Sequence, residues 1–185
     1  MKNNNDIIFS AILLFNVFVI EFVGFFATGS VSVLAYSMFI FSELSIFIVF
    51  LKSGKKKVNV KISGLFGILI FVVAALITNL SVQRYMFAGE VNGIVMVVFV
   101  LAGIMLTTSA MGKIKKRYNN DKKTSATYVI MSNIPSILVL AGGIWIAFTG
   151  ETFVDGAFGM IIAFMTILHA VRILRGTAFK QLTKQ

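Results

Sequence analysis

The sequence predicts an all-α integral membrane protein, and three observations support this fold class. First, 58% of the 185 residues are hydrophobic and only 13% are charged, which is more apolar surface than a soluble domain of this size could bury. Second, six apolar segments each approach the roughly 20 residues that a helix needs to cross a bilayer. Third, basic residues gather in alternate connecting segments. The predicted spans are about 7–28, 31–51, 62–80, 91–110, 125–148 and 153–175.

The first two spans are predicted to form a helical hairpin. Residues 7–28 are too long for the core of a signal peptide and lack a small-residue cleavage site, so they are interpreted as a membrane span. About two residues, Gly29 and Ser30, separate them from residues 31–51. Such a short turn makes the two helices antiparallel neighbours.

The last four spans complete one membrane domain. Spans 62–80 and 91–110 contain no charged residue, and span 125–148 contains Pro135, the only proline. The final span, 153–175, ends about ten residues before the end of the sequence. We therefore expect residues 1–185 to be a single transmembrane domain without a soluble C-terminal domain. Small residues at helical spacing favour close helix packing, within the bundle or between two copies: Ser63 and Gly67, Gly143 and Ala147, and Gly156 and Gly159.

The distribution of charge predicts the orientation of the spans. Of the seventeen Lys and Arg, sixteen lie in the segments joining spans two to three and four to five or near the two termini, and the exception is Arg84. Six spans bring both termini to one side, and the basic bias makes that side cytoplasmic. A multi-pass protein of the cell membrane is expected. Nucleic acid is not an expected partner, because the basic stretches lack interleaved aromatic residues and a recognisable module.

Two carboxyl groups are predicted to lie inside the membrane. Glu21 lies deep in the first span and Glu43 deep in the second. A carboxylate near mid-bilayer costs roughly 2.5–3.5 kcal/mol on insertion scales, so it normally faces protein or water. Each is interpreted either as a neutral acid hydrogen-bonded to a neighbouring helix or as a proton or cation station. The functional interpretation is favoured for Glu43 and the structural one for Glu21.

Further polar residues fall in the last two spans. In "SNIPS", Ser132, Asn133 and Ser136 flank Pro135, which removes a backbone hydrogen bond. The nearby polar side chains either satisfy the freed backbone or line a cavity in which Asn133 offers its amide oxygen to a cation. His169 in the sixth span is interpreted mainly as a histidine hydrogen-bonded to a neighbouring helix, with a ligand or proton-relay role as the alternative.

Two stretches resemble the cation diffusion facilitator family. The first is "VIEFVGFFATGSVSVLAYSMFIFSEL", in which Glu21 matches the acid of the family's first helix and Gly29-Ser30 its turn. The second, similar to the family's helices five and six, is "SNIPSILVLAGGIWIAFTGETFVDGAFGMIIAFMTILHAVRILRGTAFKQL". There Asn133 takes the place of an Asp, and Asp155 that of an external Asp. The resemblance covers most of the chain and implies a cation-efflux-like bundle, as a homodimer or a heterodimer with a related subunit.

The resemblance also implies a central transport site with two side chains from helix two and two from helix five. Side chains four residues apart share a helix face, so two such pairs can surround a divalent ion. The corresponding pairs are Phe39 with Glu43 and Val129 with Asn133. Phe and Val cannot bind a metal. Glu43 and Asn133 remain as candidate metal ligands, and oxygen-only sites suit harder cations.

The expected function is that of a cation-efflux-like secondary transporter, coupled to protons, with an altered mid-membrane site. The residues proposed for that site are Glu43, Asn133, Tyr36 and Ser132, with Glu21, Asp155 and His169 as secondary candidates. The expected substrate is a divalent cation, and no resident cofactor is expected. The alternative is a non-transporting membrane protein with an interaction, regulatory or immunity-type role. An enzyme is not expected, because the sequence shows no nucleophile–base set, phosphate loop or HExxH-like pair.

Overall fold

The computed structural model describes residues 5–53, 60–117 and 122–175, and side chains within 8–49, 61–112 and 132–175. The described residues form six α-helices, each long and apolar enough to cross a membrane. They are α1 (Asn5–Thr28), α2 (Val31–Ser53), α3 (Val60–Met86), α4 (Gly93–Arg117), α5 (Lys122–Thr149) and α6 (Phe153–Leu174). The prediction of an all-α protein with six apolar helices is confirmed.

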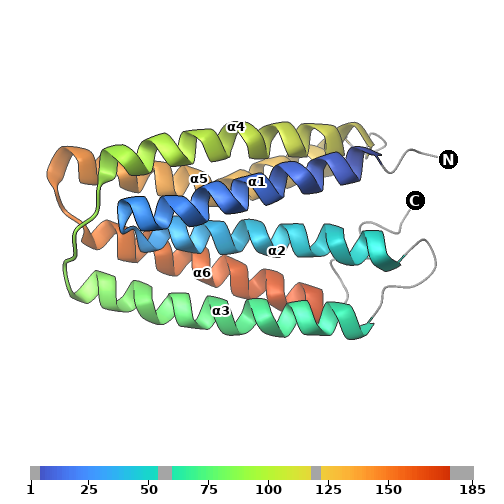
Figure 1. The fold of residues 1–185 in the computed structure, drawn as a ribbon, viewed down its shortest axis with the longest axis horizontal. Coiled ribbons are helices and arrows are strands. Elements are labelled where there is room, and N and C mark those ends of the chain that lie inside the picture. Colours follow the sequence, from blue (N-terminus) through green and yellow to red (C-terminus); the bar gives the residue numbers. More distant parts are fainter. Residues whose placement is uncertain (1–4, 54–59, 118–121, 176–185) are drawn as a thin grey trace.

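The helices run side by side along one axis, and α1 begins at the same end of the bundle at which α6 ends (Figure 1). The helix α2 is the central one, because it packs against α1, α3, α5 and α6. Within its most apolar stretch 72% of the residues are buried, whereas the figure is 28–39% for the other five helices. The helix α2 is therefore the one with the largest share of residues removed from the lipid.

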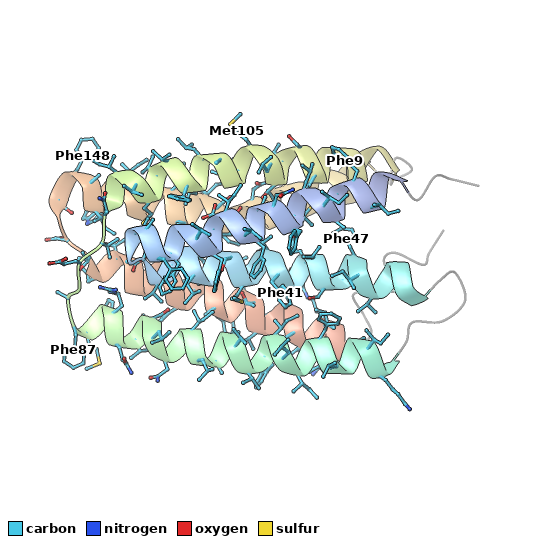
Figure 2. The ribbon with its side chains drawn as sticks, in the orientation of Figure 1. Phe9, Phe41, Phe47, Phe87, Met105 and Phe148 are labelled. Carbon is cyan, nitrogen blue, oxygen red and sulfur yellow. The ribbon has the colours of Figure 1, made fainter. Side chains whose placement is uncertain are left out.

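The outer surface of the bundle is apolar. Figure 2 shows Phe87, Met105 and Phe148 pointing away from the helices, and these side chains are 69%, 71% and 87% exposed. Large apolar side chains exposed around a whole bundle would be an aggregation hazard in water. In lipid they face hydrocarbon, which agrees with a multi-pass membrane protein.

Glycines allow several helices to approach closely. On α6, Gly156 lies against the backbone of Ser81 and Tyr85 of α3. On α5, Gly143 packs against the backbone carbonyl of Gly93 and the side chain of Met96 on α4. The small-residue pairs predicted from the sequence thus pack within the bundle, where lipid gives no hydrophobic drive for association.

The observed helices are longer than the apolar spans at several ends. The third continues to Met86 instead of about residue 80, and the fourth runs from Gly93 to Arg117 instead of about 91–110. Hydropathy marks where the chain is apolar, whereas helical hydrogen bonding continues through the polar residues beyond that point. The α5 helix likewise continues through Pro135.

Candidate functional site

Glu43 lies in the centre of the bundle and faces α5. Its side chain is 1% exposed. The hydroxyl of Ser132, on α5, donates a hydrogen bond of 2.7 Å to Oε1 of Glu43. Oε2 has no hydrogen-bond partner among the residues that the structure describes. Glu43 and Ser132, two of the residues predicted for the cation site, are therefore in direct contact across α2 and α5.

Among the described side chains of α5, Ser132 is the one for which a hydrogen bond to Glu43 is seen. Asn133, the next residue, is half-buried, and its main-chain carbonyl accepts a hydrogen bond of 2.7 Å from the Ser136 hydroxyl. This bond lies beside Pro135, whereas the carbonyl that Pro135 deprives of its helical donor is that of Met131, four residues back. The side chain of Val129, the other helix-five position of the expected cation site, lies outside the described residues.

Phe39 stands one helical turn before Glu43, and its ring is 1% exposed. The ring packs against His169 of α6, with 4.8 Å between the ring centroids. Nδ1 of His169 lies 3.3 Å from the Ser42 hydroxyl. The α6 side of α2 therefore holds a packed Phe–His pair, and His169 hydrogen-bonds to a neighbouring helix as its main interpretation predicted.

Tyr36 is fully buried and reaches toward α4 and α5. Its hydroxyl lies 3.2 Å from the Thr107 hydroxyl of α4 and also interacts with the Ser136 hydroxyl of α5. Tyr36 thus connects α2 with α4 and α5.

Glu21 is also fully buried, on α1. Neither of its carboxyl oxygens has a hydrogen-bond partner within the described part of the chain. The carboxyl group lies against Gly103 of α4, where a Cβ atom would overlap it. Gly103 and Thr107, four residues apart on α4, were missed from the sequence, because glycine and threonine are common in membrane helices. Their one-turn spacing, which puts both on one face of α4, was the available signal.

Asp155, at the start of α6, holds the beginning of α2. Its carboxylate accepts hydrogen bonds from the backbone N–H groups of Val31 and Ser32, at 2.8 and 3.0 Å, and from the hydroxyls of Ser30 and Ser32, both at 2.6 Å. Nε of Arg84 lies 3.8 Å from the carboxylate. The first N–H groups of a helix lack intrahelical partners and favour a negative charge. Asp155 therefore caps α2 from another helix, at the end of the bundle where α2 begins.

The described residues contain no group of three or more His, Cys, Asp or Glu side chains that could hold a metal ion. A cation bound beside Glu43 would depend on hydroxyl, amide and water oxygens, which suit hard cations. No family model matches the sequence, and no curated protein matches it either. The resemblance to cation diffusion facilitators thus depends on the sequence motifs alone.

Proposed function

We propose that the protein is a proton-coupled secondary transporter of the cation-efflux type, in which Glu43 alternately binds a proton and a divalent cation. The observation that carries this proposal is the position of Glu43. It is a buried acid on the most enclosed helix, with one oxygen hydrogen-bonded to Ser132 and the other without a partner in the described structure. Buried acids in membrane helices mark ion and proton pathways by default.

The arrangement of helices supports exchange at this site. Glu43 lies on α2 and its partner Ser132 on α5, and few contacts join these two helices compared with the contacts that α2 makes to α1 and α6. A small displacement of α5 would open the side of Glu43 that Ser132 covers. A protonated Glu43 is neutral and can keep the Ser132 hydrogen bond, whereas an ionised Glu43 attracts a cation. One acid can therefore couple the movement of protons to the movement of the cation.

We further propose that both termini face the cytoplasm and that the protein lies in the cell membrane. The concentration of Lys and Arg in the segments that join α2 to α3 and α4 to α5, and near the two termini, supports this orientation. The sequence resemblance supports assembly as a dimer, with a second copy or a related subunit.

A flux assay in proteoliposomes tests the transport proposal. Zinc, manganese, iron and cobalt ions are offered one at a time under an imposed proton gradient. We expect at least one of them to move with the gradient, and Glu43→Gln to abolish that movement. Glu151→Gln is the matched control, because Glu151 is an exposed acid before α6 and its loss should leave transport unchanged. If none of the ions moves, the transport proposal is wrong.

A second candidate function is a non-transporting interaction protein. It is favoured by Phe39, whose buried ring fills one of the two α2 positions expected to bind the ion. In that case the Glu43–Ser132 bond would hold two helices together and serve no ion. Glu43→Gln, which can still accept the Ser132 hydrogen bond, would then leave the protein's binding to its partner intact.

A further inference from the structure

Glu21 occupies a buried position that packing alone does not explain. It is fully buried between α1 and α4, and both of its carboxyl oxygens lack a hydrogen-bond partner among the described residues. An unsatisfied buried polar group costs about 1–3 kcal/mol, which a hydrophobic residue of similar size would avoid. The absence of a side chain at Gly103 leaves the room that the carboxyl group occupies. The structure thus keeps an acid at a position where an apolar side chain would be more stable.

Tyr36 links this acid to the rest of the polar interior. The Tyr36 ring lies beside Gly103, 3.4 Å from the position of a Cβ there, and so borders the Glu21 carboxyl group. The Tyr36 hydroxyl meets Thr107 on α4 and Ser136 on α5. A phenol hydroxyl can donate one hydrogen bond and accept another at the same time.

Two serines of α5 extend the connection from Tyr36 to Glu43. Ser136 interacts with the Tyr36 hydroxyl, and Ser132, one helical turn earlier, donates to Glu43 at 2.7 Å. Residues four apart lie on one face of a helix. One face of α5 thus carries a hydroxyl group near Tyr36 and another near Glu43.

We propose that Glu21 is a second proton-binding site and that Tyr36 couples it to Glu43. This assignment takes its role in transport from the proposed function, whereas its test below does not require transport. Each acid binds and releases its proton at its own site, and the charge left on one acid changes the proton affinity of the other.

The other titratable groups near the pair are few. Among the described side chains of α2 and α4, the helices packed against α1, Tyr36 is the titratable group beside Glu21, and α4 presents Gly103 and Thr107 there. Near Glu43, α6 contributes His169, which contacts Ser42 and Phe39 and has Arg172 close to it. If the protonation of one acid depends on that of the other, we therefore expect this dependence to pass through Tyr36.

Infrared difference spectroscopy of the purified protein in lipid tests this coupling. The carbonyl-stretch band of a protonated acid is assigned to each site by its loss in Glu21→Gln or Glu43→Gln, and both bands are followed during a pH titration. We expect Glu43→Gln to move the titration midpoint of Glu21 by about one pH unit or more, the size at which two sites count as coupled. Glu21→Gln should move the midpoint of Glu43 by the same amount, because linkage is reciprocal.

Tyr36→Phe removes the linking hydroxyl and keeps the buried ring. In this background the effect of Glu43→Gln on Glu21 should fall by at least half, as measured in a double-mutant cycle. Equal effects with and without the Tyr36 hydroxyl would overturn its linking role. The proposal of a second proton-binding site would be overturned if the Glu21 band did not titrate, or if Glu43→Gln left its titration midpoint unchanged. If the bands are coupled but no divalent cation is transported, only the proposed function fails.

Gly103→Ala tests the geometry of the site independently. The added methyl group overlaps the Glu21 carboxyl, so we expect the Glu21 band to change in frequency or midpoint while the band of Glu43 remains. Gly112→Ala, on the same helix, is the matched control, because no heavy atom lies within 4 Å of its Cβ position. An unchanged Glu21 band in Gly103→Ala would contradict the placement of that carboxyl group.

Discussion

Replacement of Asp155 by Ala removes the acceptor that holds the first turn of α2 to α6. The carboxylate is completely buried and receives four hydrogen bonds, two from backbone N–H groups and two from serine hydroxyls. It also faces Arg84, whose side chain is 18% exposed and donates a hydrogen bond of 2.8 Å to the Gly29 carbonyl. Without Asp155, these donors lose their common acceptor and Arg84 loses its ion pair.

The expected loss of stability is about 3 kcal/mol. Loss of a helix cap alone costs about 1 kcal/mol. Removal of one partner from a buried ion pair costs roughly 3–5 kcal/mol. The lower end of that range applies because Arg84 is partly exposed and keeps its bond to Gly29. Asp155→Asn, which keeps one carbonyl acceptor and loses the charge, should give a smaller loss than Asp155→Ala.

Equilibrium unfolding by sodium dodecyl sulfate in lipid bicelles measures this free energy. Glu151→Ala is the matched control, because this acid is exposed in the turn before α6, and its removal should change the free energy of unfolding by less than about 0.5 kcal/mol. If Asp155→Ala and Glu151→Ala differ by less than about 1 kcal/mol, the capping argument is refuted.

Two further predictions concern the turns and the orientation. Gly29 has φ +68°, and a Cβ there would lie 2.8 Å from the Glu90 carbonyl oxygen, whereas Gly150 has φ +75° with no atom within 4 Å. Gly29→Ala should therefore destabilise the protein by more than Gly150→Ala, which adds only the left-handed backbone cost of about 1–2 kcal/mol; equal losses in bicelle unfolding would contradict the close contact. The sequence contains no Cys, so single cysteines report orientation: an impermeant thiol reagent should label Glu151→Cys in intact cells and Arg175→Cys only after permeabilisation, and the reverse pattern would contradict cytoplasmic termini.

The architecture could be predicted from sequence because bilayer thickness fixes the length of a spanning helix. The turn at Gly29 and the six apolar helices follow from local signals of this kind. The central position of α2 was not predicted from hydropathy, since all six segments are strongly apolar and lipid does not distinguish buried from exposed apolar faces. Small polar residues were the usable signal, because α2 is rich in buried serines: Ser32, Ser37, Ser42 and Ser45.

The candidate site was partly predictable. The sequence indicated Glu43 and the polar residues before Pro135, and the structure pairs Glu43 with Ser132. Gly103 escaped notice because its importance is the space that it leaves for Glu21 on another helix. The capping of α2 by Asp155 joins residues 123 to 125 positions apart in the chain, and no local pattern encodes such a contact.

The central claim is that water reaches Glu43 during a working cycle. Ser132→Cys tests it most directly, because the replaced hydroxyl touches Glu43 and a thiol reacts with water-soluble methanethiosulfonates only where water can enter. Ala163→Cys is the matched buried control, since Ala163 is 1% exposed in the core on α6. We predict that Ser132→Cys is modified in proteoliposomes while Ala163→Cys stays unreactive. If both thiols are equally unreactive, with and without a proton gradient, the interior is closed and the transport account is contradicted.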